Sequence, residues 1–146
     1  MTTKSDILIP NPQKILSSID IPTLVQDLGY VVSFDQNTGQ MRLDHPELIL
    51  EFLVPKIGMG SDKPKDIEKL GINAFPIRYG NILEQNFIYV EIDGIRFKIP
   101  HPVCFAFQKL LICGRRTTLE KARKDKSTAI TVLHLVIQKR EEWKIR

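Results

Sequence analysis

The sequence predicts an α+β fold in which a mixed β-sheet is followed by two C-terminal helices. Two observations carry this prediction. Short apolar runs separated by turn residues fill residues 1–100. The remainder has the 3.6-residue periodicity of amphipathic helices. We therefore expect residues 1–100 to form a β-rich core and residues 101–146 to form a helical part of the same unit.

The first third of the chain alternates signals for strands and turns. Residues 6–9 form a short apolar run closed by a proline, which indicates a strand. Pro12 favours the start of a helix, and we expect Pro22 to break that helix. Residues 30–34 and 40–43 are strand-like runs joined by a loop that contains glycine, which predicts a hairpin.

The central part holds the most apolar strand and a second hairpin. Residues 48–54 are almost continuously apolar, whereas residues 55–70 are rich in Gly, Pro, Ser and Lys and are expected to be a loop. Residues 74–78 are expected to be extended, and Pro76 places them at a sheet edge. Residues 87–99 surround an Asp-Gly pair, which predicts a hairpin with a type I′ turn.

The last third predicts two helices. The first begins at His101-Pro102 and extends to about Cys113. The second extends from about Thr118 to Lys139, and apolar residues recur along it at helical spacing.

Composition excludes several classes of protein. The chain has 146 residues, is 42% hydrophobic and has a net charge of +4, which permits a phosphate-bearing partner without requiring one. No run reaches the roughly 18 apolar residues of a membrane span, and no signal peptide is evident. Cys104 and Cys113 are the only cysteines and are expected to be reduced. We therefore expect a soluble, cytoplasmic protein.

Two carboxylates are candidates for chemistry. Asp6 lies on the first strand and Glu51 lies within the apolar central strand. A carboxylate there is costly unless it is paired or binds a metal, and two on adjacent strands could hold Mg²⁺. The alternative is that Glu51 points to the solvent face of a half-exposed strand.

A basic group lies on the two helices and their connection. It comprises Lys109, Arg115, Arg116, Lys121 and Lys124. Such a cluster can hold phosphate oxygens. The alternative is a solvated face with Lys121 and Asp125 as an i,i+4 pair. The three histidines have no metal-ligand neighbour at useful spacing, so structural or surface roles are expected for them.

Several stretches resemble a bacterial nucleotidyltransferase-fold family, and together they extend over nearly the whole chain. They are residues 2–10 (TTKSDILIP), 51–55 (EFLVP), 60 with 62–64 (G, DKP), 70–74 (LGINA), 76–79 (PIRY), 99–102 (IPHP), 105–110 (FAFQKL), 115–116 (RR) and 121–125 (KARKD). Their order and spacing are more specific than any single motif among them.

The resemblance implies metal-assisted transfer of a nucleoside monophosphate from a nucleoside triphosphate (NTP). Asp6 and Glu51 would be the second and third carboxylates that hold Mg²⁺ or Mn²⁺. Lys109 and Lys124, with Arg115 or Arg116, would face the nucleotide. The position of the first carboxylate falls on Lys4, however, and the chain begins too close to this strand to hold the family's Gly-Ser turn.

Three hypotheses follow. The first is a nucleotidyltransferase acting on an unknown acceptor, which the incomplete carboxylate triad would leave weak or inactive. The second is a non-catalytic domain of the same fold that binds a nucleotide, a nucleic acid or a protein, with self-association at an open sheet edge. The third, an unrelated nucleic-acid-binding protein, is disfavoured by the modest charge and few aromatic residues.

Overall fold

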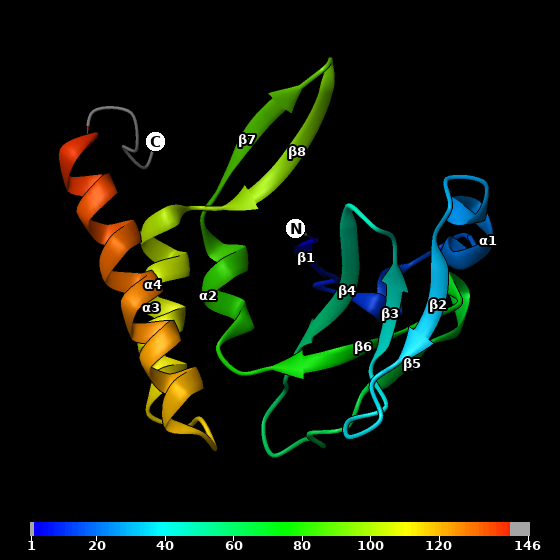
Figure 1. Ribbon diagram of the computed structural model, residues 1–146, viewed down its shortest axis with the longest axis horizontal. Helices are drawn as coiled ribbons and strands as arrows, with labels where there is room; N and C mark the ends of the chain where they lie inside the picture. Colours follow the sequence, from blue (N-terminus) through cyan, green and yellow to red (C-terminus); the bar gives the residue numbers. More distant parts are fainter. Residues whose placement is uncertain (1, 141–146) are drawn as a thin grey trace. The chain divides into compact units, whose positions relative to one another are not determined.

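The computed structural model describes residues 2–140, and the chain divides into two compact units, Met1–Arg78 and Tyr79–Arg146. The predicted α+β class is confirmed, with a mixed sheet in the first unit and two long helices ending the second (Figure 1). Among the described residues, the strands of the second hairpin pair only with each other and lie in the second unit.

The first unit is built on a six-stranded sheet. Its strands are β1 (Thr3–Leu8), β2 (Val31–Phe34), β3 (Met41–Asp44), β4 (Leu48–Pro55), β5 (Lys65–Ile67) and β6 (Ile72–Ile77). The order is β2-β3-β4-β6-β5, and β1 pairs with β4 in parallel. The predicted hairpin of β2 and β3 is confirmed.

Strand β4 is the centre of this sheet because three strands pair with it. β1 follows it from Leu48 to Leu53, β3 pairs with it in antiparallel orientation, and β6 pairs in parallel with its last residues. Successive side chains of a strand point to opposite faces. Phe52 and Val54 therefore belong to the core face, and Glu51 belongs to the other face.

The core lies on one side of the sheet. Its buried residues are Leu43, Phe52, Val54, Ile67, Ile72 and Ala74. The segment that follows β1 contributes partly buried apolar side chains to this core, including Ile9, Ile15 and Val25. This segment contains a short 3-10 turn (Pro12–Lys14) and helix α1 (Ile21–Gln26).

Proline and loop positions differ from the expectations in three places. Pro22 lies in the first turn of α1 and does not break a helix. Backbone N–H groups in the first turn have no acceptor within the helix, so the missing N–H of proline costs no hydrogen bond there. Residues 55–70 include β5 and a 3-10 turn at Glu68–Leu70. Pro76 lies on β6, an inner strand, but beyond Ala74, where the pairing with β5 ends.

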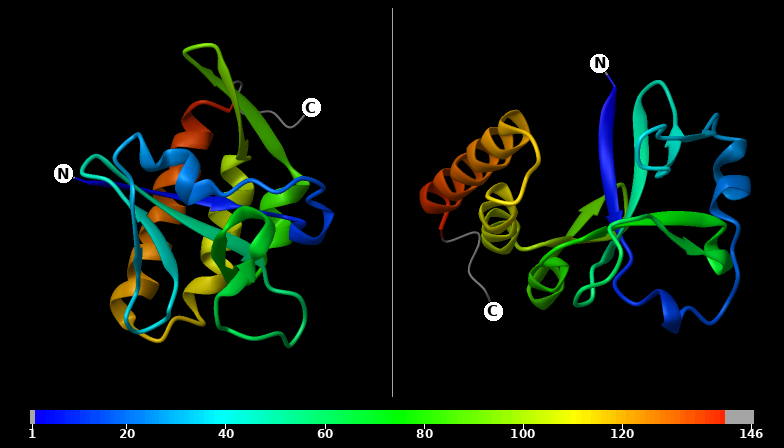
Figure 2. Two further views of the ribbon diagram at one scale, coloured as in Figure 1. Left: turned by 90° about the vertical axis from the view of Figure 1, so that its right-hand side faces the viewer. Right: turned by 90° about the horizontal axis from the view of Figure 1, so that it is seen from below.

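The second unit consists of a hairpin and three helices. They are α2 (Gly80–Gln85), β7 (Phe87–Ile92), β8 (Ile95–Pro100), α3 (Pro102–Cys113) and α4 (Leu119–Gln138). Asp93 and Gly94 both have positive φ, at 51° and 77°, so the predicted type I′ turn is confirmed. Helix α4 packs along α3 (Figure 2).

Each long helix begins at a side chain that accepts a backbone hydrogen bond. The Nδ1 of the buried His101 accepts from the N–H of Val103, and Thr118 accepts from the N–H of Lys121. Cys104 and Cys113 are both free. No helix of residues 2–140 is long and apolar enough to cross a membrane.

Candidate functional site

Three charged residues lie together on the face of the first-unit sheet that is opposite the core. In the parallel register of β1 and β4, Asp6 is paired with Glu51, so their side chains point to the same face. Lys4 is two residues before Asp6 and shares that face. Its Nζ lies 2.7 Å from Glu51 Oε2. The structure therefore brings Asp6 and Glu51 together, with a lysine beside them.

Glu51 is buried although it is not on the core face. Its side chain is 10% exposed, compared with 55% for Lys4. The alternative in which Glu51 points to solvent is therefore wrong, because its carboxylate is buried and paired with Lys4 on a strand that lies between β1 and β3. The side chain of Asp6 is exposed and forms no hydrogen bond or ion pair with another described residue.

The charged face continues onto β3 and β2. Arg42 is paired with Glu51 in the β3–β4 register, and its guanidinium contacts Asp44 at 3.0 Å. Hydrogen bonding to Asp44 raises the pKa of Arg42. The hydroxyl of Ser33 donates to Asp44 and is the main cause of that carboxyl's lowered pKa, to which Arg42 adds. Positive and negative side chains thus lie side by side on β1, β4 and β3, and β2 adds the hydroxyl of Ser33.

These residues do not fit a divalent cation. Mg²⁺ and Mn²⁺ need several oxygen ligands with a surplus of negative charge. Here the buried carboxylate already has an ammonium as its partner, and Arg42 lies at the paired position on its other side. Across residues 2–140, no group of three His, Cys, Asp or Glu side chains could hold a metal ion.

The second unit contains a separate charged cluster between α3 and α4. Asp125 of α4 is buried, with a side chain that is 7% exposed. Its Oδ1 lies 3.3 Å from Lys109 Nζ, and its Oδ2 lies 2.5 Å from Arg116 Nε. Burial by itself raises the pKa of Asp125, but the hydrogen bond from Arg116 and the charge of Lys109 outweigh burial and leave the pKa below its usual value.

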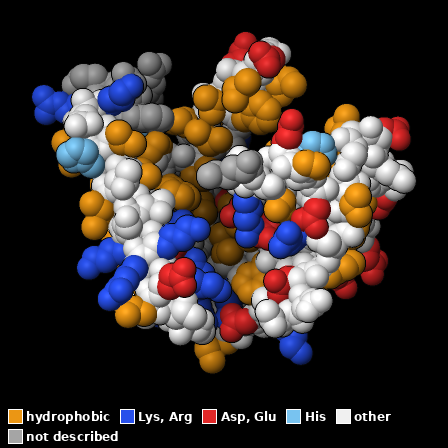
Figure 3. Space-filling model, in the orientation of Figure 1, with side chains coloured by type: hydrophobic (Ala, Val, Ile, Leu, Met, Phe, Trp, Pro, Cys, Tyr) orange, Lys and Arg blue, Asp and Glu red, His pale blue; other side chains and the backbone are white. Residues whose placement is uncertain are grey.

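Two of the predicted basic residues are thus held together by one carboxylate. The expected pair of Lys121 and Asp125 is not formed, because Asp125 points into the contact with α3 and pairs with Lys109 and Arg116. The guanidinium of Arg115 lies over the ring of Tyr79, 5.8 Å from its centre. Lys121 and Lys124 are exposed in the first half of α4, where basic side chains gather in Figure 3.

Lys109 and Arg116 both pair with Asp125, which leaves a surplus of positive charge. One carboxylate faces two cations, whose side chains are 25% and 36% exposed. Arg116 uses only Nε on Asp125, so its two Nη groups keep donors for another acceptor. This arrangement suits an anion with several oxygens, such as a phosphate group.

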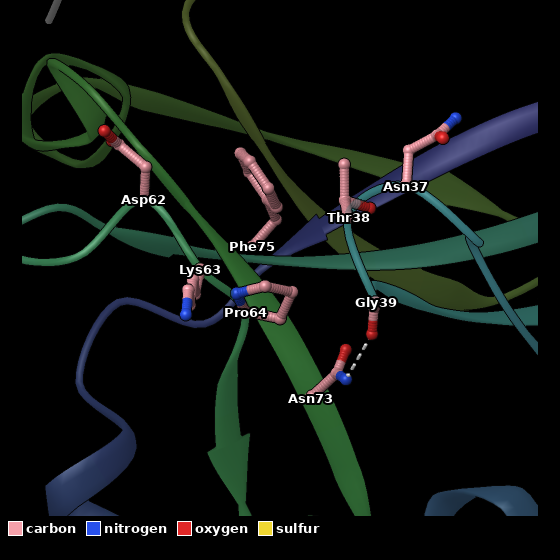
Figure 4. Close-up of a pocket in the computed structure, with 8 residues that line it drawn as sticks. All are labelled: Asn37, Thr38, Gly39, Asp62, Lys63, Pro64, Asn73 and Phe75. Carbon is pink, nitrogen blue, oxygen red and sulfur yellow. Dashed lines mark hydrogen bonds between the residues drawn. The ribbon is translucent and has the colours of Figure 1, made fainter.

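A shallow depression in the first unit has different chemistry. It has a volume of about 440 Å³ and lies between the turn at residues 37–39 and the loop at residues 62–64 (Figure 4). The amide of Asn73 lines it, but this amide donates to Gly39 O and accepts from the N–H of Met41. Both the donor and the acceptor of this amide are therefore used in hydrogen bonds to the backbone.

Two of the contacts that define these clusters are not evident from the sequence. The family resemblance marks Lys4 only as an obstacle to metal binding, and helical spacing favours Asp125 only as a surface partner of Lys121. A carboxylate at the i+4 position from a lysine favours the local pair, and nothing in the local pattern points to α3. Asp125 does lie three residues after Ala122 and four before Ala129, so it shares one face of α4 with these alanines. This spacing indicates that Asp125 is buried.

Comparison with known protein families gives a match. A family model described as a nucleotidyltransferase matches residues 9–145. The matched range includes Glu51 and the five basic residues of the helices and begins directly after β1, which carries Lys4 and Asp6. No curated protein and no solved structure matches the chain.

Proposed function

Because the chain belongs to the nucleotidyltransferase family, we propose that it binds the phosphate groups of a nucleoside triphosphate through the basic residues of α3 and α4. The observation that carries this proposal is the cluster around Asp125. Its carboxylate holds Lys109 and Arg116 at 3.3 Å and 2.5 Å and leaves one positive charge uncompensated. The exposed Lys121 and Lys124 add charge on the same helix as Asp125.

The transfer reaction that the family resemblance implies is expected to be weak or absent in this chain by itself. It would use Asp6 and Glu51 with Mg²⁺ or Mn²⁺ and an acceptor that is a nucleic acid, a protein or a small molecule. The ion pair between Lys4 and Glu51 supports this expectation, because a carboxylate that is neutralised by an ammonium is a poor metal ligand.

Binding is tested with tripolyphosphate and with each of the four NTPs, without metal and at low salt, by isothermal titration calorimetry. Arg116→Gln removes the charge but keeps an amide that can donate to Asp125, so the fold should survive. A hydrogen bond to a charged group contributes about 1.5 to 3 kcal/mol, so affinity should fall about tenfold or more. Lys121→Ala combined with Lys124→Ala should also weaken binding.

A matched control is Lys65→Gln, which removes the same charge from an exposed position on β5. It should leave the affinity unchanged apart from a small effect of net charge. The proposal fails if the wild type and all variants bind with equal affinity, or if the wild type does not bind. Selectivity for an NTP over tripolyphosphate would show that base and sugar are recognised as well.

Self-association is a second expectation that the strand order supports. One edge of β1 pairs with β4, and no described strand pairs with the other edge of β1. An edge of this kind presents unpaired backbone groups that can pair with another chain. Sedimentation velocity over a range of concentrations tests this, and a monomer throughout would exclude it.

A further inference from the structure

The negative charge of Glu51 is balanced within the sheet itself. This carboxylate is on the side of the sheet opposite the core, yet it is almost fully buried. Burying a charge is unfavourable unless an opposite charge accompanies it. The nearest opposite charge is the Lys4 ammonium at 2.7 Å, donated by the neighbouring parallel strand. The protein therefore carries its own cation at this position.

The surroundings of Glu51 reinforce this arrangement. Arg42 occupies the paired position on β3, and its positive charge also acts on Glu51. Arg42 is itself bound to Asp44 on the same strand, and Asp44 in turn accepts from Ser33 on β2, so contacts within β3 and with β2 hold Arg42 in place. A divalent cation placed beside Glu51 would be repelled from both sides.

Asp6 is the third charged residue beside Lys4 and Glu51 on this face of the sheet. It is paired with Glu51 in register and lies two residues after Lys4 on the same face, so the three side chains form a compact group. If residue 4 carried a carboxylate, this group would contain three carboxylates on two adjacent strands. That composition is typical of sites for hard divalent cations.

We propose that the Lys4 ammonium takes the place of a divalent cation on this sheet face and excludes Mg²⁺ and Mn²⁺ from it. The site formed by Lys4, Asp6 and Glu51 is then independent of metal. One substitution, Lys4→Asp, should convert it into a site that binds a divalent cation. The proposal concerns metal alone, so its outcome does not depend on whether the chain binds nucleotide.

Mn²⁺ is the probe, because the electron paramagnetic resonance signal of the free ion measures binding directly. The wild-type protein should show no saturable site below millimolar Mn²⁺. Lys4→Asp should bind one Mn²⁺ at least tenfold more tightly, and Mg²⁺ should displace it. The double variant Lys4→Asp/Glu51→Gln should lose this gain. Lys14→Asp, which makes the same charge change at an exposed position of the first unit, should show no gain.

Folding is monitored in parallel, because three neighbouring carboxylates repel one another without metal. Mn²⁺ should raise the thermal midpoint of Lys4→Asp by several degrees more than that of Lys14→Asp. If Lys4→Asp does not fold even with Mn²⁺, Lys4→Met decides, since it removes the ammonium without adding a charge. It should bind Mn²⁺ more tightly than the wild type does.

Two results would overturn the proposal. One is a wild-type protein that binds Mn²⁺ with micromolar affinity and loses it in Asp6→Asn/Glu51→Gln. The other is the failure of both Lys4 variants to bind Mn²⁺ more tightly than the wild type.

Discussion

Asp125→Asn tests whether one buried carboxylate joins α3 to α4. The carboxylate faces Lys109 Nζ at 3.3 Å and Arg116 Nε at 2.5 Å, and its side chain is 7% exposed. A carboxamide keeps one oxygen acceptor but loses the charge, and it turns an N–H₂ group towards one of the two cations. Breaking a buried ion pair costs about 3 to 5 kcal/mol. Because Lys109 and Arg116 are partly exposed, we expect about 3 kcal/mol, the lower end of that range.

The assay is thermal unfolding followed by circular dichroism at the helix band. A loss of about 3 kcal/mol should lower the midpoint by about 10 °C in a chain of this size. The control is Glu120→Gln, which makes the same charge change at an exposed position in the first turn of α4. It should cost about 0.5 kcal/mol or less, from the helix dipole alone.

The pH dependence gives an independent test of the same contact. The pKa of Asp125 is lower in the folded protein than its ordinary value of 3.8. The stability from this carboxylate is therefore fully present above about pH 5 and is lost as the pH falls through the folded pKa. The difference in stability between wild type and Asp125→Asn should shrink below about pH 4. A difference that stays constant to pH 2.5, or equal midpoints at pH 7, would refute the reasoning.

Two further substitutions test the first unit. Gly71 has φ of +64°, and a Cβ there would lie 1.9 Å from Oδ1 of Asp20, the residue that caps α1. Gly71→Ala should cost about 1 kcal/mol for the left-handed backbone and about 1 kcal/mol for the displaced cap. The control Gly39→Ala, with φ of +74° and open space at the Cβ, should cost only the first of these in urea unfolding. Phe52→Ala removes the largest fully buried side chain and should destabilise by about 3 to 5 kcal/mol, and a loss below 1 kcal/mol would place Phe52 outside the core.

The sequence predicted the parts of the fold that depend on neighbouring residues. The Asp93-Gly94 turn followed from its two residues, because few pairs tolerate positive φ at both positions. The long helices followed from periodicity, and the strand at residues 48–54 followed from its unbroken apolar run. Prolines were predicted less well, because their effect depends on whether an N–H is needed at that position, as Pro22 shows.

The sequence by itself determined the α+β class, the hairpins, the two helices and the nucleotidyltransferase resemblance, together with the residue types that could carry charge chemistry. Only the tertiary structure decided which charges meet. The parallel register of β1 and β4 places Lys4 against Glu51, and the packing of α3 on α4 turns Asp125 towards Lys109 and Arg116. Local patterns follow from interactions within a few residues, whereas these ion pairs join different elements, and local patterns do not specify how those elements pack against one another.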